Sequence, residues 1–227
     1  MTKFLASVNN LPDAVLVANL GADIVDLKQP SQGALGALSV TEVKSIVDAL
    51  KSKVTISATV GDLEFVPEMV VPAVQSMLAT GVDIVKIGLF PGGHVQDCLD
   101  ALRCYTQNNH QLIAVLFADS PIDLDVLAAL AEAKFTGVML DTMHKTSGRL
   151  TELLSHEYLS DFISIAKHYK LLTGLAGSLQ RQDIPDLLDL KPDYLGFRGA
   201  LCQGLQRNNP IDTKQVSTIR ELLAGYP

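Results

Sequence analysis

The sequence predicts an α/β protein of the (β/α)8 TIM barrel class. Short β-branched runs alternate with stretches of helical periodicity along the whole chain, several of these runs are continuously apolar, and polar residues end most of them. Continuous apolar runs are typical of parallel strands that are buried on both faces. Eight strands, each followed by a helix, is the count of a closed barrel.

Each predicted strand is bounded by Gly, Pro, Asp or Ser residues. The eight runs are Phe4–Val8, Asp23–Lys28, Val54–Val60, Ile84–Leu89, Leu112–Ala118, Gly137–Asp141, Leu171–Ala176 and Tyr194–Arg198. The helical stretches between them include Thr41–Lys51, Val71–Thr80, His94–Gln107, Leu124–Ala133, Tyr158–Tyr169 and Thr213–Leu223. An open doubly wound sheet would share this alternation, but no Gly-x-Gly-x-x-Gly turn follows the first run. The barrel is therefore favoured.

Composition limits the partners that we expect. The 227 residues fit one barrel domain, 1–227, and the net charge of −7 with a pI near 5.1 argues against nucleic acid and anionic membranes. Three cysteines without metal-ligand spacing are typical of a reducing, cytoplasmic protein. The first apolar run is too short for a signal peptide. We expect neither a metal nor a cofactor, because no zinc spacing and no dinucleotide motif occurs.

Two lysines stand at strand ends where a lysine is unusual. Asp26 and Lys28 share one face of the second run, and Lys86 lies between Val85 and Ile87 in the fourth. Burying an ammonium without a partner is costly, so a purely structural role is hard to justify for such a pair. A lysine amine that is shielded from water beside another cation loses its proton more readily and becomes a nucleophile. The pair predicts amine chemistry on a carbonyl compound.

Other polar residues end the third, fifth and sixth runs. Asp141 could hold an ammonium or move protons, or could cap a helix, and His144 follows it in a loop. Ser57 and Thr59 are expected to face inward, where they could bind substrate hydroxyls. The strand-end acids Asp62 and Asp119 could be catalytic, but Asp62 could instead cap the segment after it.

The last two runs are followed by small residues. Barrels often bind phosphate with the backbone of these two loops, and small side chains let the backbone approach the anion. The residues that fit are Gly177, Ser178, Arg198, Gly199 and Ala200, among which Arg198 adds a fixed charge. The sequence therefore predicts a phosphorylated small-molecule substrate. The Asn208-Asn209-Pro210 segment beyond them is expected to be a turn.

Six motifs in order resemble the (5-formylfuran-3-yl)methyl phosphate synthases, also called 4-(hydroxymethyl)-2-furancarboxaldehyde-phosphate synthases, of methanofuran biosynthesis. The resemblance spans about residues 4 to 223. The motifs are Asp26-Leu-Lys-Gln-Pro-Ser-Gln-Gly-Ala-Leu-Gly36, Ser57-Ala-Thr-Val-Gly-Asp62, Val85-Lys-Ile-Gly-Leu89, Met139-Leu-Asp-Thr142, Leu175-Ala-Gly-Ser178 and Arg198-Gly-Ala200.

This resemblance implies a specific reaction and specific roles. Two glyceraldehyde 3-phosphate molecules would condense into a furan aldehyde phosphate with loss of phosphate and water, in a methanogen or a methylotrophic bacterium. Lys28 would form the Schiff base beside Asp26, Lys86 and Asp141 would transfer protons, and Lys145 would be a further base or phosphate partner. Two phosphates need two anion sites. We expect one at the last two strand loops and the other at the Gln32–Gly36 loop with Lys145.

Three alternatives stay open on the residues alone. Lys28 and Lys86 could each form the imine. A class I aldolase acting on another sugar phosphate would share the lysine and the phosphate loops, and a barrel that only binds a phosphorylated ligand would form no imine. We expect a homo-oligomer, although an apolar helix at Leu124–Ala133 suits the core as well as an interface between copies.

Overall fold

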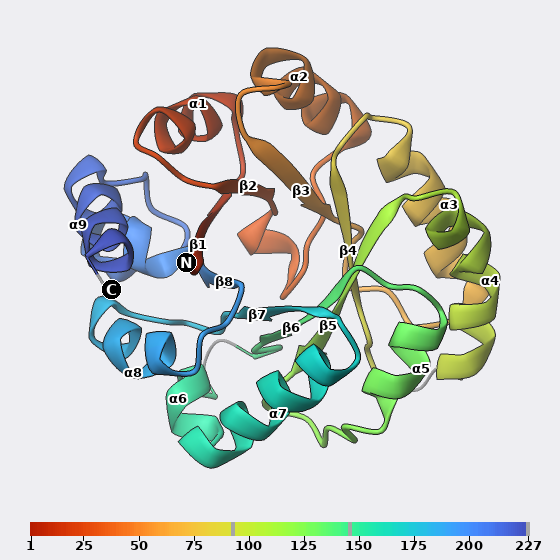
Figure 1. Cartoon of the computed structure of the whole chain (residues 1–227). Helices are drawn as coiled ribbons and strands as arrows, with labels where there is room; N and C mark the ends of the chain where they lie inside the picture. The colour runs from red at the N-terminus through yellow and green to blue at the C-terminus, as the bar shows by residue number, and fades with distance from the viewer. Residues whose placement is uncertain (92–93, 145–146, 226–227) are drawn as a thin grey trace.

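The strands close into a barrel. In the computed structural model, which describes residues 1–91, 94–144 and 147–225, eight parallel strands pair in chain order and β8 pairs back with β1 (Figure 1). The strands are β1 (Lys3–Val8), β2 (Ile24–Leu27), β3 (Thr55–Thr59), β4 (Ile84–Gly88), β5 (Gln111–Phe117), β6 (Gly137–Asp141), β7 (Leu172–Leu175) and β8 (Tyr194–Phe197). The predicted fold class is confirmed, and each predicted strand agrees with the structure to within one residue at either end.

Helices ring the barrel, and α9 stands beside α1 and β1 to complete the ring (Figure 1). The α-helices are α1 (Leu11–Asn19), α2 (Val40–Leu50), α3 (Pro67–Leu78), α4 (Val95–Gln107), α5 (Val126–Glu132), α6 (Leu150–Leu153), α7 (His156–His168), α8 (Ile184–Asp189) and α9 (Thr213–Ala224). Short 3-10 turns are η1 (Pro30–Gln32), η2 (Arg181–Asp183), η3 (Gly199–Leu201) and η4 (Gln203–Leu205).

Polar side chains fix where several helices begin. Asn10 accepts from the Asp13 amide at α1, and Ser39 forms a reciprocal capping box with Glu42 at α2. The predicted start of the third helix at Val71 was wrong by four residues. Pro67 occupies the first helical position, where its missing N–H costs nothing, and Pro72 is accommodated inside the helix.

Alternation along each strand separates two cores. On β2, Val25 and Leu27 pack outward among the residues beneath the helices, whereas Ile24 packs inside the barrel with Leu5 and Met139. Asp26, between Val25 and Leu27, is therefore directed into the barrel. The same alternation directs polar residues of several strands into the barrel interior, next to the apolar side chains that fill the rest of it.

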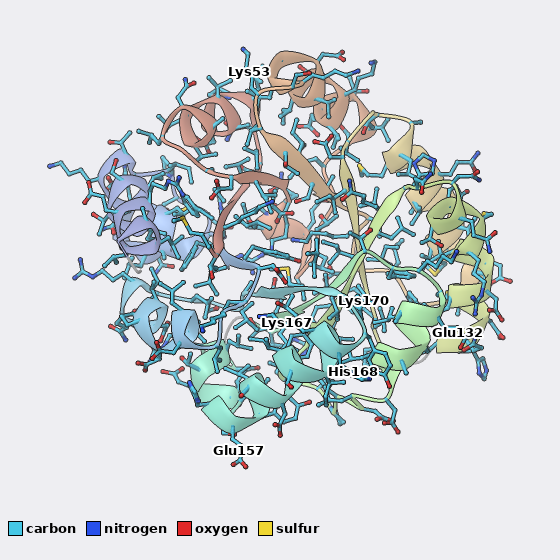
Figure 2. The ribbon with its side chains drawn as sticks, viewed as in Figure 1. Lys53, Glu132, Glu157, Lys167, His168 and Lys170 are labelled. Atoms are coloured by element: carbon cyan, nitrogen blue, oxygen red, sulfur yellow. The ribbon has the colours of Figure 1, made fainter. Side chains whose placement is uncertain are left out.

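Charged side chains divide between the outer surface and this interior. Lys53, Glu132 and Glu157 lie around the outside of the molecule (Figure 2). Within the described ranges, the buried charged residues are Asp26, Lys28, Lys86, Asp141 and Asp183. Buried charges are rare unless they are paired, so the four on or next to the strands, which exclude Asp183 of η2, mark the part of the barrel that needs explaining. In the portion of the chain that the structure describes, no helix has the length and apolar character needed to cross a bilayer.

Candidate active site

A cavity of about 410 Å³ opens at the carboxyl ends of the strands. Its lining includes Lys28, Lys86 and Asp141 from β2, β4 and β6 or their ends, together with the loops after β7 and β8. This is the mouth at which barrel enzymes carry their active sites, and the volume suits a small-molecule ligand.

Lys28 lies in this cavity and forms an ion pair with Asp141. The Nζ atom of Lys28 donates to Oδ2 of Asp141 at 3.2 Å, and Oδ1 of Asp141 accepts from the Thr142 amide at 2.7 Å. Both side chains are almost fully buried. The carboxylate therefore holds the amine in one position. At this distance a proton can pass between the Lys28 amine and the Asp141 carboxylate.

Lys86 forms a second, deeper ion pair with Asp26. Its Nζ donates to Oδ1 of Asp26 at 2.9 Å, and the two side chains are 1% and 0% exposed. Burial alone would raise the pKa of Asp26, but the charges of Lys86 and Lys28 and a hydrogen bond from Ser57 bring it below the ordinary value of 3.8. The carboxylate thus stays ionised beside both lysines.

The predicted hydroxyl residues lie beside this second pair. Ser57 donates its Oγ proton to Asp26 at 2.7 Å, and Ser7, which the sequence analysis did not single out, donates to the other oxygen at 2.7 Å. Thr59 donates to the backbone oxygen of Gly36 at 3.1 Å. Both predicted hydroxyls thus have protein partners, which fix Asp26 and the loop after β2. Their binding of substrate stays a prediction.

The predicted phosphate-binding residues gather on one side of the cavity. Gly177, Ser178, Arg198, Gly199 and Ala200 all line it, and η3 begins directly after β8 at Gly199. Arg198 donates to the backbone oxygens of Arg207 at 2.8 Å and Ser7 at 3.2 Å. These contacts hold the guanidinium at the rim without neutralising its charge.

Two strand-end acids hold neighbouring loops. Asp62 accepts from the amides of Ala34 at 2.8 Å and Leu35 at 2.6 Å, so it anchors the loop before it, a role that neither of the two sequence-based alternatives, catalysis or capping of the segment after it, included. Asp119 accepts from the amides of Met143 at 2.7 Å and His144 at 2.6 Å. Burial opposes ionisation of Asp119, but these backbone donors bring its pKa below the ordinary value. Both acids therefore shape the rim. Lys145 lies outside the described residues.

Comparison with known proteins identifies the family. The 4-HFC-P synthase family model matches residues 4–220. The chain belongs to the 4-HFC-P synthase family. A (5-formylfuran-3-yl)methyl phosphate synthase of Methanopyrus kandleri is 32% identical over 234 residues, covering 98% of this chain and 99% of that one. A Methylorubrum extorquens protein that bears the same name provisionally is 37% identical over 225 residues, covering 99% and 93%.

Solved structures show the fold of this 4-HFC-P synthase family member. Phosphoribosyl anthranilate isomerase from Thermotoga maritima superposes with a TM-score of 0.71 at 15% identity, covering both chains completely. The 3-hexulose-6-phosphate synthase from Salmonella typhimurium superposes with a TM-score of 0.70, also at 15% identity and full coverage. At 15% sequence identity, this structural similarity shows the barrel fold and nothing about function.

Two arginines of this 4-HFC-P synthase family member line the cavity without having been expected there. Arg149, before α6, pairs with Glu152 at 2.8 Å and Asp183 at 2.7 Å. Arg207 lies in the segment after η4 and reaches across to the loop after β2. One signal for Arg207 was present in the sequence, its position as a cation next to the predicted Asn208–Pro210 turn. Its partners could not be predicted, because they lie more than 170 residues earlier in the chain.

Proposed function

We propose that this chain is a (5-formylfuran-3-yl)methyl phosphate synthase, a carbon–oxygen lyase acting on phosphates, which condenses two glyceraldehyde 3-phosphate molecules through a Schiff base on Lys28. Two such molecules supply the atoms of the furan phosphate, one phosphate and two water molecules, so no oxidant is needed. The product would serve methanofuran biosynthesis, as the resemblance of the sequence motifs implies. Relatives that bear the synthase name and align over almost the whole chain support the proposal.

The observation that carries the mechanism is the buried Lys28 amine in the cavity, paired with Asp141 at 3.2 Å. Proton transfer from the ammonium would free the amine for attack on the substrate carbonyl. Asp141 is then placed to return a proton to the carbinolamine oxygen, so that water leaves and the imine forms.

The Lys86–Asp26 pair supports the next steps. An imine acidifies the carbon next to it, and loss of that proton gives an enamine whose carbon attacks the carbonyl carbon of the second triose phosphate. Lys86 lines the same cavity and donates a hydrogen bond to Asp26. Lys86 can therefore transfer protons in these steps, and the ionised Asp26 carboxylate stabilises its charged form. Attack of a hydroxyl of the second triose on the imine carbon then closes the ring and releases the Lys28 amine, and elimination of phosphate and water gives the aromatic furan, which makes the sequence irreversible.

Borohydride trapping tests the Schiff base. Incubation of the protein with glyceraldehyde 3-phosphate and borohydride is expected to add one reduced triose phosphate to Lys28, located by peptide mass mapping. Lys28→Met should show no adduct and lose furan formation at least about a thousandfold, the scale expected for removing a covalent catalyst. Lys53→Met, which changes an exposed lysine, is the matched control.

Each other result has a definite meaning. An adduct that maps to Lys86 would transfer the covalent role to that residue. Accumulation of an open-chain sugar phosphate without a furan chromophore would identify a class I aldolase. Binding of the substrate without any adduct would favour a barrel that only holds a phosphorylated ligand.

A further inference from the structure

Two of the cations in the cavity have no carboxylate partner within residues 1–91, 94–144 and 147–225. Among the described residues, its cationic lining consists of Lys28, Lys86, Arg149, Arg198 and Arg207. Lys28 is paired with Asp141 and Lys86 with Asp26, whereas Arg149 is paired with both Glu152 and Asp183. Arg198 and Arg207 donate only to backbone oxygens within the described ranges. Two guanidinium charges are thus left for ligands of opposite charge.

Arg207 is held in place by the loop after β2. Its Nη2 donates to the backbone oxygens of Pro30 and, at 2.8 Å, of Gly33. Its Nε is buried and has no hydrogen-bond partner in the part of the chain that the structure describes. Burial lowers the pKa of Arg207, and the charge of Arg198 acts in the same direction, whereas Asp141 and Asp62 oppose both. An anion would relieve the repulsion between the two arginines.

A second cavity, shallower and more open to solvent than the first and of about 510 Å³, adjoins it at Arg207. Pro30 and Arg207 line both cavities, and Phe90 and His144 contribute to the second. Asp62 also borders it, but its carboxylate accepts from two backbone amides, which offset part of its charge. Arg207 therefore stands between the lysines and a space that is open to a further molecule.

We propose that Arg207 binds the phosphate of the second triose phosphate, while Arg198 and the loops after β7 and β8 bind that of the first. This inference rests on the proposed function and assigns a residue to its second anion site. Among the described residues, Nη1 of Arg207 has no hydrogen-bond partner, so it can donate to a phosphate while Nη2 stays bound to the loop and fixes the position of the guanidinium charge.

The proposal replaces the site expected from the sequence at the Gln32–Gly36 loop. The amides of Ala34 and Leu35 already donate to Asp62, and that of Gln32 donates to the Gln29 oxygen at 3.1 Å. Those backbone donors are occupied. The loop instead presents carbonyl oxygens, and these position the Arg207 guanidinium beside the cavity.

The test separates binding of the first triose phosphate from that of the second. Full-length Arg207→Gln is compared with the wild-type chain in two assays: the yield of the borohydride adduct on Lys28, and furan formation against glyceraldehyde 3-phosphate concentration. We expect the adduct yield to stay within about twofold, while kcat/KM for the furan falls roughly 10- to 100-fold through a higher half-saturating concentration. Arg207→Lys should recover part of this loss.

Arg103→Gln is the matched control. Arg103 lies on α4 and donates to a backbone oxygen as Arg207 does, that of Glu132 at 2.9 Å, so its loss should alter neither assay. An unchanged half-saturating concentration in Arg207→Gln overturns the proposal. A parallel fall of adduct and furan overturns it too, because Arg207 would then act through Lys28 or its loop. If the wild-type chain forms neither adduct nor furan, the proposed function itself fails and this inference fails with it.

Discussion

Asp26 is the residue on which the interior of the site is organised. Its two carboxylate oxygens accept from Ser7, Ser57 and Lys86, so side chains of β1, β3 and β4 all meet on one side chain of β2. A buried ion pair is costly to form, and removing one partner typically costs about 3–5 kcal/mol because the other charge is left without compensation. The network is therefore expected to serve chemistry more than stability.

Gly174 and Tyr194 pack against each other inside the same barrel. A Cβ atom on Gly174 would lie 2.2 Å from the Tyr194 ring, which is fully buried and cannot move aside. Gly174→Ala should therefore destabilise the protein by about 1–3 kcal/mol or more through overpacking. The Tyr194 hydroxyl, by contrast, has no partner among the described residues. Tyr194→Phe should leave stability unchanged or raise it.

Thermal unfolding of the two variants beside the wild-type chain measures both effects. Burial, together with the charges of Asp26 and Asp193, raises the pKa of Tyr194, so the hydroxyl stays protonated across the usual pH range and the comparison needs no pH correction. A loss of more than about 1 kcal/mol in Tyr194→Phe would show that the hydroxyl has a partner, such as a buried water.

At the scale of elements, the loops at the mouth are held by acids from neighbouring strand ends. Asp62, after β3, holds the loop after β2, and Asp119, after β5, holds the loop after β6. Gly33 allows this close approach, since a Cβ atom there would lie 2.1 Å from Asp62 Oδ2 and its φ is +125°. Each acid thereby makes one loop depend on its neighbour.

Sequence reasoning found the strands because their periodicity is local. The same reasoning placed Lys28 and Asp141 at strand ends and Lys86 within a strand facing inward, from which barrel geometry brings them to one cavity. It could not see that Asp62 anchors residues 34 and 35, because an acid after a strand suits a cap, a catalyst or an anchor equally well. That choice depends on where the preceding loop folds back, which no local pattern records.

Asp62→Ala tests the importance of this anchoring. The carboxylate is exposed, so water can replace it for the two amides and the loss of stability should stay below about 1 kcal/mol. Furan formation should nevertheless fall about 10- to 100-fold, because the loop that follows Lys28 loses its position. Removing the negative charge of Asp62 from the edge of the second cavity should by itself strengthen binding of an anionic ligand. A fall in furan formation would therefore result from the lost position of the loop and not from the change in charge.

Ser39→Ala is the matched change in the same segment. It removes the capping box of α2 and should cost about 0.5–2 kcal/mol without altering furan formation. Unfolding and activity are measured together on both variants. If Asp62→Ala retains wild-type activity, the anchor has no bearing on the site.

At the scale of the whole molecule, closure of the barrel unites residues that are distant in sequence. Lys28 and Asp141 are 113 positions apart, and Arg207 meets Gly33 across 174. The strand pairs were implied by the eight-strand count, since chain order fixes neighbours in a closed parallel barrel. Contacts between loops follow no such rule, and for this reason only the structure revealed that Arg207 lines the cavity.

The carboxylates of this architecture also give the molecule a pH dependence. Asp26 and Asp119 both have a pKa below the ordinary Asp value of 3.8 in the folded chain. A group whose pKa is lower when folded binds its proton more readily when unfolded. It therefore stabilises the fold fully at pH values well above 3.8, and this contribution is lost as the pH falls through 3.8 toward the folded value.

Asp119→Asn isolates one such contribution. The amide keeps an acceptor for the Met143 or His144 N–H but has no charge and does not titrate, so the variant should unfold at a lower temperature than the wild-type chain at pH 7. The difference between their thermal midpoints should then narrow as the pH falls from about 5 to 3. Asp161→Asn, an exposed position on α7, serves as the control and should show no such narrowing. A difference that stays constant across this range would mean that the Asp119 contacts do not depend on its charge.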